Sequence, residues 1–245
     1  MSKFGIVAAL AAEAHCLGTA PGGRAALSPL PGGALLAISG IGYAAAALAA
    51  RRLADAGVTA LLSWGMAGGL DPGLRAGSVV LPSEVIGADG SAFATAFEWR
   101  EALLTAVESQ LPASRGKLLT SPQAIASVAA KAAAFRATGA AAVDMESLAI
   151  AEIAAARGLP FIAVRVIVDT AGDSLPRSIL AASSGGPLRI WRLVGGLAAA
   201  PADVADLLRL MRRYRAARRA LAAIARSAML GPPSAGKVTP CRRRA

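Results

Sequence analysis

Histidine, cysteine and charged residues are scarce in this chain of 245 residues, and each shortage excludes a class of protein. His15 is the only histidine, which excludes a His-rich zinc site and leaves a Ser-His-Asp triad a single ring to be built around. The two cysteines, Cys16 and Cys241, are too few for a disulfide scaffold and are typical of a reducing cytoplasm. Charged residues make up 17% and apolar residues 55%, a composition that excludes an intrinsically disordered chain.

Long, strongly apolar runs are also missing. Residues 25–50 carry no charge, but prolines and glycines interrupt this stretch and most of its bulk is alanine. A membrane-spanning helix needs ~20 consecutive apolar residues. We therefore predict a buried strand, a glycine turn and a small-residue helix here. The apolar run Phe4–Ala9 leads to Glu13 instead of a cleavage site, which favours a first strand over a secretion signal and predicts a cytoplasmic protein.

Aromatic and acidic residues are few as well, which bears on the partners that the chain can bind. Aromatic residues make up 4%, a low share for a protein that stacks on bases. Residues 203–245 hold ten arginines and one lysine against two aspartates, and so carry +9 of the formal net charge of +11. Such a segment attracts anions. We expect peripheral contact with the anionic inner membrane and no nucleic-acid partner.

A single domain is expected over residues 1–230, since one α/β domain of this size is ordinary. Its last part, residues 203–229, is predicted as one long basic helix because apolar residues recur there at helical spacing. Residues 231–245 have no periodic apolar pattern and include three consecutive arginines. We predict that these residues form a disordered basic tail.

Strand and helix patterns alternate along the first 170 residues. Short apolar runs predict strands at residues 4–9, 34–38, 59–63, 78–82 and 161–168, and helical spacing predicts helices at 43–56, 97–110, 126–137 and 145–155. The glycine-dense residues 65–69 are predicted as a turn. This alternation predicts an α/β fold with a mostly parallel central sheet flanked by helices.

Three carboxylates follow predicted strands, where open parallel sheets bind ligands. Glu13 comes after the first strand, Glu146 opens a helix, and Asp169 ends the most apolar strand. Each also has a plainer interpretation, since Glu146 can complement a helix dipole and Asp169 can act as a cap. Arg165 lies inside an apolar strand and needs a carboxylate partner. His15 and Cys16 are interpreted as packing residues.

Five segments together carry a family resemblance. They are GIVAALAAE (5–13), SGIG (39–42), GMAGGLDPGLRAG (65–77), VDME (143–146) and PFIAVRVIVD (160–169). In this order and at these separations they resemble the nucleoside phosphorylase and nucleosidase superfamily, and its methylthioadenosine/S-adenosylhomocysteine nucleosidases above all. Residues 173–177 and the arginine-rich helix are similar to the hopanoid-associated branch, whose substrate class is adenosylhopane. The resemblance implies cleavage of adenosylhopane to ribosylhopane and adenine, with no cofactor, no metal and a homo-oligomeric assembly.

The resemblance also implies roles for single residues. Asp169 matches the acid that protonates N7 of the leaving base, for which burial must raise its pKa. Glu13 matches the base that activates water. Glu146 matches the acceptor of the ribose 2′- and 3′-hydroxyls, with Arg165 positioning or neutralising it and Met145 packing on the sugar. The other residues implied to bind substrate are Gly40, Met66, Ala67, Gly68 and Ile125.

The chain also departs from the family pattern. Met66 stands where Ser or Thr is usual, and methionine cannot donate a hydrogen bond to phosphate or water. Val168 replaces a frequent Ser, and Ala124 stands near the position of an aromatic that stacks on adenine, leaving Phe161 and Trp64 as unassigned alternatives. Besides adenosylhopane cleavage, a purine nucleoside phosphorylase and a methylthioadenosine/S-adenosylhomocysteine nucleosidase therefore stay open. The low aromatic content disfavours a nucleic-acid-binding protein.

Overall fold

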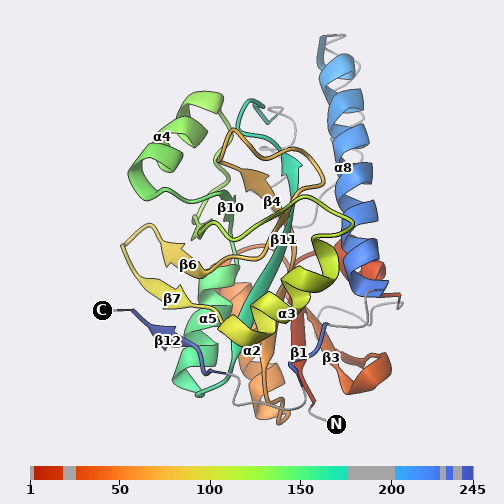
Figure 1. The fold of residues 1–245 in the computed structure, drawn as a ribbon, viewed down its shortest axis with the longest axis vertical. Helices are drawn as coiled ribbons and strands as arrows, with labels where there is room; N and C mark the ends of the chain where they lie inside the picture. The colour runs from red at the N-terminus through yellow and green to blue at the C-terminus, as the bar shows by residue number, and fades with distance from the viewer. Residues whose placement is uncertain (1–2, 19–25, 176–201, 227–229, 234–238, 245) are drawn as a thin grey trace.

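A computed structural model of the chain describes residues 3–18, 26–175, 202–226, 230–233 and 239–244 (Figure 1). The strands are β1 (Gly5–Ala8), β2 (Leu27–Pro29), β3 (Leu35–Ile38), β4 (Leu61–Gly69), β5 (Val79–Val80), β6 (Glu84–Gly87), β7 (Ala92–Ala94), β8 (Ala113–Ser114), β9 (Leu118–Thr120), β10 (Ala142–Asp144), β11 (Phe161–Asp169) and β12 (Arg242–Arg243). The helices are α1 (Ala11–Ala14), α2 (Tyr43–Asp55), α3 (Phe97–Val107), α4 (Val128–Thr138), α5 (Ser147–Ala156) and α8 (Ala202–Arg226), with 3₁₀ turns η1 (His15–Leu17) and η2 (Pro31–Gly33).

Parallel pairing forms the centre of the sheet. β4 lies between β1 and β11 and is parallel to both, and β11 follows β4 in register from Phe161 opposite Leu61 to Ile167 opposite Ala67. Other pairs are antiparallel, such as β2 with β3, β6 with β7 and β10 with β4. The sheet is therefore mixed, with a parallel core, and the expected α/β fold is confirmed.

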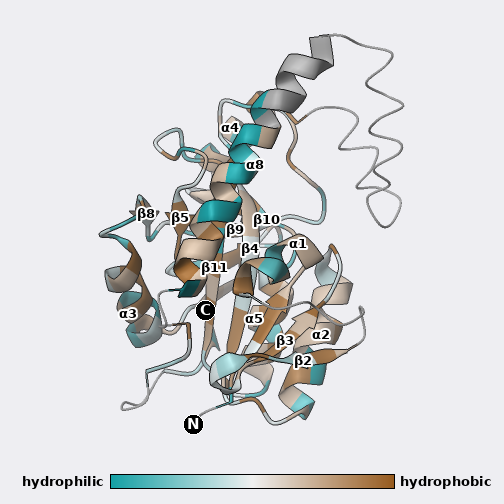
Figure 2. Ribbon diagram, turned by 90° about the vertical axis from the view of Figure 1, so that its right-hand side faces the viewer, coloured by the Kyte–Doolittle hydropathy of each residue, from teal (hydrophilic) through white to brown (hydrophobic). Residues whose placement is uncertain are grey.

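Alternation along the central strands creates two buried layers. Ile6, Leu62 and Ile162 point into a core that also contains side chains of α3 and α8, whereas Val7 and Phe161 point into a second core with α2 and α5. Strands that are covered on both faces need apolar residues at nearly every position, which explains their continuous apolar runs. The helices cover the sheet on both sides, as expected from the sequence (Figures 1 and 2).

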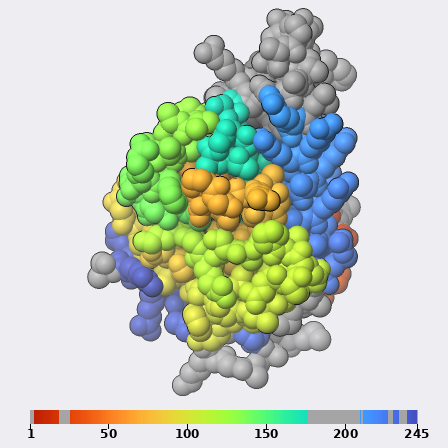
Figure 3. All heavy atoms as spheres, turned by 45° about the horizontal axis from the view of Figure 1, so that its top comes forward, coloured from red at the N-terminus to blue at the C-terminus, as the bar shows by residue number. Residues whose placement is uncertain are grey.

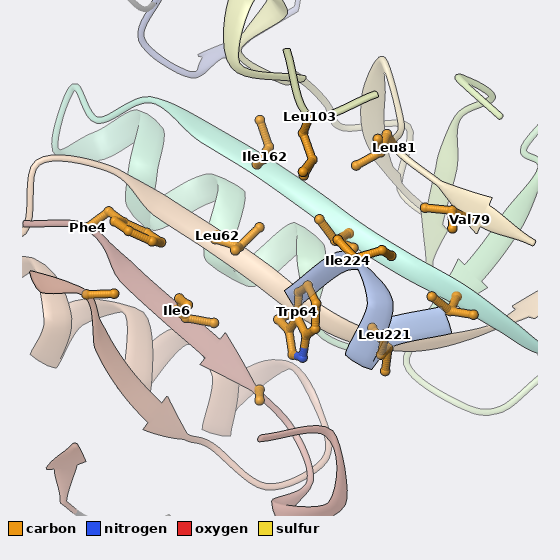
Figure 4. Close-up of a cluster of buried hydrophobic side chains, with 14 of the residues drawn as sticks. Phe4, Ile6, Leu62, Trp64, Val79, Leu81, Leu103, Ile162, Leu221 and Ile224 are labelled. Atoms are coloured by element: carbon orange, nitrogen blue, oxygen red, sulfur yellow. The ribbon is translucent and has the colours of Figure 1, made fainter. Parts of the chain in front are cut away.

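The basic helix α8 is part of the main core. Leu221 and Ile224 approach Trp64 on the face of the sheet (Figure 4), and Ala217 and Ala220 are buried beside them. Burying a Leu or Ile side chain stabilises a fold by ~1.5–3 kcal/mol. The predicted helix at 203–229 is confirmed for residues 203–226, and residues 227–229 lie outside the described part.

Two local predictions differ from the structure. Residues 65–69, predicted as a turn, are the last part of β4. The tail predicted to be disordered contains β12, which pairs antiparallel with β7, and Cys241 beside it is buried. Without β12, β7 would be the edge strand, and the free backbone groups of an edge can pair with a strand that has no apolar pattern. Residues 234–238 of the tail and the predicted loop at 183–187 are outside the described residues.

Within the described ranges, no helix combines the length and the apolar character needed to cross a bilayer.

Candidate active site

Three buried carboxylates mark the carboxyl ends of the central strands. Glu13, Glu146 and Asp169 are only 5%, 9% and 5% exposed, and burial raises the pKa of each. Burial in a low-dielectric environment disfavours the charged form of a carboxyl group. The segments that follow β4 and β11 lie next to α4 and α8 on one face of the molecule (Figure 3). The three buried carboxylates are the same three that the sequence analysis selected as candidates.

Glu13 is held against the end of β4. Its Oε1 accepts a hydrogen bond from the Met66 N–H at 2.8 Å, and its Oε2 accepts one from the Leu10 N–H at 3.0 Å. The indole N–H of Trp64 donates to the Glu13 carbonyl at 3.1 Å. Gly65 is required here, because a Cβ at that position would lie 2.6 Å from Glu13 Oε1. The glycine that looked like a turn signal therefore makes room for a carboxylate.

Glu146 is the residue at the N-terminus of α5, directly after β10. Its Oε1 accepts from the Gly42 N–H at 2.8 Å and its Oε2 from the Met145 N–H at 3.2 Å. Burial and the nearby Asp144 raise the pKa of Glu146 to about 7, although the charge of Arg165 lowers it. Glu13 also raises this pKa, which places the two carboxylates within electrostatic range of each other.

Arg165 pairs with a different carboxylate from the one expected. Its Nε donates to Asp144 Oδ2 at 2.9 Å, and one terminal nitrogen donates to Ser63 Oγ at 2.7 Å and Ser147 Oγ at 2.9 Å. No hydrogen bond joins it to Glu146 among the described contacts. The expected direct positioning of Glu146 is therefore replaced by an influence through charge, since Arg165 lowers the pKa values of both Glu146 and Glu13.

Asp144 was not assigned a role from the sequence, although it lies in the VDME segment. Its Oδ1 accepts from the Thr120 hydroxyl at 2.7 Å, and its Oδ2 accepts from the Ser147 N–H at 3.1 Å. It is buried with its partners. Its position in that segment, two residues before Glu146, was the signal in the sequence that could have indicated a role for Asp144. Asp144 and Arg165 form a buried ion pair, and the charge of Arg165 acts on both glutamates.

Asp169 forms an ion pair with Lys131, a second residue that sequence reasoning missed. Lys131 comes from α4 and is 0% exposed, and its ammonium group also donates to the carbonyls of Thr170 at 2.8 Å and Asp173 at 3.0 Å. The Lys131 charge lowers the pKa of Asp169, but burial is the larger effect and leaves it raised. The signal that could have indicated Lys131 was a single lysine in an alanine-rich helix.

The remaining predicted residues line the same edge of the sheet or pack behind it. Gly68 lies beside Asp169, since a Cβ there would be 3.2 Å from Oδ2, and the Gly40 N–H donates to the Ala9 carbonyl at 3.1 Å after β3. Met66 and Met145 are half-buried and Ala67 is buried. Ile125 packs in a small separate cluster with Leu70, Leu119, Ala140 and Val143.

The structure also bears on the interpretations of Trp64, Phe161, His15 and Cys16. Trp64 and Phe161 are 1% and 0% exposed, so neither can stack on a base. His15 is exposed and lines a pocket with Cys16, so the interpretation of His15 as a packing residue is wrong, whereas Cys16 does pack partly against the core. Among the described residues, no three His, Cys, Asp or Glu side chains are grouped closely enough to hold a metal ion.

Chemically, the arrangement combines a proton donor with two hydrogen-bond acceptors. A carboxyl group with a raised pKa, such as that of Asp169, can carry a proton at a pH where an ordinary aspartate is ionised. Glu13 and Glu146 lie on the other side of β4 residues 66–68 and share the positive potential of Arg165. Such a set suits a reaction in which a leaving group gains a proton while a second carboxylate serves the attacking group.

Comparison with known proteins gives one family and several similar folds. Residues 7–184 match the model of the phosphorylase superfamily. A 5′-methylthioadenosine/S-adenosylhomocysteine nucleosidase from Colwellia psychrerythraea, solved with adenine, is 27% identical with a TM-score of 0.62 over 70% of this chain and 84% of that one. The corresponding Neisseria meningitidis nucleosidase, with methylthio-immucillin-A, is 21% identical with a TM-score of 0.68 over 93% and 100%. A futalosine hydrolase mutant from Helicobacter pylori is 20% identical with a TM-score of 0.59 over 68% and 89%.

Proposed function

Because the chain belongs to the phosphorylase superfamily, we propose that it is a nucleosidase that hydrolyses the N-glycosidic bond of an adenosyl group. The observation that carries this proposal is the set of three buried carboxylates, Glu13, Glu146 and Asp169, around the end of β4. The nucleosidase from Colwellia psychrerythraea, which binds adenine, supports the same reaction.

Asp169 acts as the acid in this proposal. Its protonated carboxyl donates to N7 of adenine, the C1′–N9 bond breaks with its electron pair going to the base, and positive charge develops on the ribose ring. Donation leaves a carboxylate next to the ammonium of Lys131, which stabilises the charge that forms. Protonation of a leaving group is typically worth ~10²–10⁴-fold in rate.

Glu146 and Glu13 serve the sugar and the water. Glu146 accepts hydrogen bonds from the ribose 2′- and 3′-hydroxyls, and its negative charge favours the developing positive charge on the ring. Glu13 takes a proton from the water that attacks C1′. Gly40, Met66, Ala67, Gly68, Ile125 and Met145 complete the proposed substrate site.

Hydrolysis is favoured over phosphorolysis by the state of Arg165. Its Nε and both terminal nitrogens already donate to Asp144, Val164, Ser63 and Ser147, so it does not offer a free guanidinium edge to phosphate. Met66 presents no side-chain donor either. The hydrogen-bond donor that is lost by having Met66 instead of Ser or Thr is therefore not replaced by Arg165.

The proposed substrate is an adenosyl group with an apolar 5′ substituent, namely adenosylhopane, which yields ribosylhopane and adenine. The resemblance of residues 173–177 and of the arginine-rich helix to the hopanoid-associated branch supports this choice. Ile41, between two glycines of which Gly42 contacts Glu146, is 38% exposed, and Met66 and Met145 are only half-buried. These apolar side chains can contact a hydrocarbon substituent at the 5′ position. The alternative is a methylthioadenosine/S-adenosylhomocysteine nucleosidase, which the similar structures favour.

Adenine release measured with and without phosphate tests the reaction. We expect full activity in phosphate-free buffer, and a higher kcat/KM on adenosylhopane in detergent than on methylthioadenosine. A strict requirement for phosphate, with a sugar 1-phosphate as product, would show phosphorolysis instead. Full activity with a preference for methylthioadenosine would keep the nucleosidase and reject the hopanoid substrate.

The pKa of Glu146 predicts the acid limb of the pH profile. Below about pH 7 this group becomes protonated and can no longer accept from both ribose hydroxyls. Because kcat/KM reports groups of the free enzyme, it should fall as the pH drops through 7. The limb should disappear in Glu146→Gln, whose activity should be lost much less on a 2′-deoxy substrate than on the ribonucleoside. An unchanged limb, or equal losses on both substrates, would remove Glu146 from the sugar site.

We propose a cytoplasmic location with peripheral contact to an anionic inner membrane through α8. A substrate with a hopane skeleton resides in a membrane, and basic residues gain ~1 kcal/mol each near an anionic surface. Arg212, Arg215, Arg218, Arg219 and Arg226 are exposed on this helix. A homo-oligomeric assembly remains a prediction from the family resemblance.

A further inference from the structure

A pocket of about 550 Å³ lies between η1 and α8, outside the proposed catalytic site. Residues 15–18 form one wall. Four arginines of α8 contribute to the other, namely Arg215, Arg218, Arg219 and Arg226. Figure 2 shows α8 passing close to α1, with hydrophilic residues along the helix. The volume lies within the range of small-molecule sites.

Within the described part of the chain, the positive charges of this pocket have no acidic partners. Some other arginines do pair with carboxylates: Arg213 of the same helix pairs with Asp173, and Arg157 pairs with Asp55. Among the described residues, no carboxylate forms an ion pair with any of the four pocket arginines. Like charges gathered in one concavity repel one another and create a strong positive potential, which an anion relieves.

The spacing along α8 explains why the arginines converge. Arg215, Arg218, Arg219 and Arg226 recur at helical spacing and share one side of the helix. The core residues Ala217, Leu221 and Ile224 occupy another side and anchor the helix to the sheet. The guanidinium groups are therefore presented from a fixed backbone rather than from a mobile tail.

His15 adds a further polar group to the opposite wall. Its Nδ1 lies 2.6 Å from the Ala11 carbonyl, which can only accept, so Nδ1 carries the hydrogen. The Nε2 atom is left for a ligand, as an acceptor when the ring is neutral and as a donor when it is protonated. Hydroxyl-bearing phosphoryl groups can use both properties.

We propose that this pocket binds a phosphoryl group with more than one negative charge. Arginine guanidinium groups match phosphate oxygens through paired N–H donors, and several of them together favour a phosphomonoester or diphosphate over a single carboxylate. The same chemistry occurs in a soluble phosphorylated compound and in a lipid headgroup. The proposal is independent of the reaction assigned to the three carboxylates.

Binding of inorganic pyrophosphate to the full chain, measured by calorimetry, tests the soluble source. We expect saturable one-site binding that weakens at least tenfold in the double variant Arg218→Gln/Arg219→Gln. The control is Arg212→Gln, which removes an exposed arginine of the same helix that does not line the pocket. It should change the affinity less than threefold. Binding should also raise the melting temperature of the wild type and not that of the double variant.

Co-sedimentation with phosphatidylcholine vesicles tests the lipid source. One set carries phosphatidic acid, which has a phosphomonoester, and the other carries phosphatidylglycerol at equal charge. A preference for phosphatidic acid that the double variant loses and Arg212→Gln keeps would support a headgroup site. Pocket-dependent pyrophosphate binding without this preference would support a soluble ligand.

Two results would overturn the proposal. One is equal weakening by Arg212→Gln and by the double variant in both assays, which would show diffuse attraction to a basic helix. The other is the absence of both pyrophosphate binding and a phosphatidic acid preference. Arg212, Arg218 and Arg219 are all exposed, so none of these substitutions should prevent folding.

Discussion

Replacement of Asp169 by asparagine is expected to reduce adenine release by at least ~100-fold, because an amide cannot supply the proton that the leaving base needs. The initial rate of adenine formation at saturating substrate measures this loss. Asp71→Asn is the matched control, since Asp71 lies just beyond β4 and, among the described contacts, its side chain accepts one turn hydrogen bond, from the Gly73 N–H at 2.8 Å. This control should keep nearly full activity.

Loss of the Asp169 charge also leaves Lys131 buried without its partner, so stability must be separated from chemistry. The double variant Asp169→Asn/Lys131→Met removes both charges and should recover much of any loss in melting temperature. Its activity should stay as low as that of the single variant. A folded Asp169→Asn protein with more than about a tenth of wild-type turnover would rule out the acid role.

Asp144→Asn should be among the most destabilising conservative substitutions in the chain. It breaks the ion pair with Arg165, in which the two side chains are 1% and 3% exposed, and leaves the guanidinium uncompensated. Removing one member of a buried pair typically costs ~3–5 kcal/mol. For a domain of this size that corresponds to a fall in Tm of roughly 10 °C, which calorimetry or circular dichroism can measure.

The surface pair of Arg157 and Asp55 provides the control for Asp144. Its nitrogen–oxygen distance is 2.7 Å against 2.8 Å in the buried pair, but the Asp55 side chain is 62% exposed. Asp55→Asn should therefore cost at most ~1 kcal/mol. Similar costs for the two variants would contradict the importance of burial, and Asp144→Asn/Arg165→Met should cost less than the sum of the single changes.

Asp144→Asn should also shift a catalytic pH profile. The Asp144 charge is one of the causes that raise the pKa of Glu146, so removing it should lower that pKa. The acid limb of kcat/KM then moves to a pH below about 7 in the folded variant. A purely structural role for Asp144 would leave the position of that limb unchanged.

The fold was predictable because its main signals are local. The apolar runs that became β1, β3 and β11 alternate with helical spacing, and Glu13 and Asp169 had to lie near each other because they mark the ends of the parallel strands β1 and β11. Glu146 joins them differently, since it follows β10, which runs antiparallel to β4. The family resemblance added chemical roles that no spacing could supply.

The partners within the site were harder to predict, because they depend on tertiary contacts. Arg165 visibly needed a carboxylate, but Asp144 and Glu146 are two residues apart, and only the folded backbone decides which one it contacts. Lys131 lies 38 residues from Asp169 in a helix with no other sign of function. The strand β12 escaped prediction since backbone pairing, not an apolar pattern, attaches it to β7.

The strand β4 has a further consequence for the chemistry. Its Met66 N–H donates to Glu13, and its Gly68 lies next to Asp169. The proposed base and the proposed acid therefore contact residues that are two positions apart on the same strand. One such repeat measures about 6.8 Å along an extended backbone. The distance between the proposed base and the proposed acid is therefore set by the strand β4 and not by loops. Loops around this edge can change to admit a different 5′ substituent while that spacing, and with it the bond that is cut, stays the same.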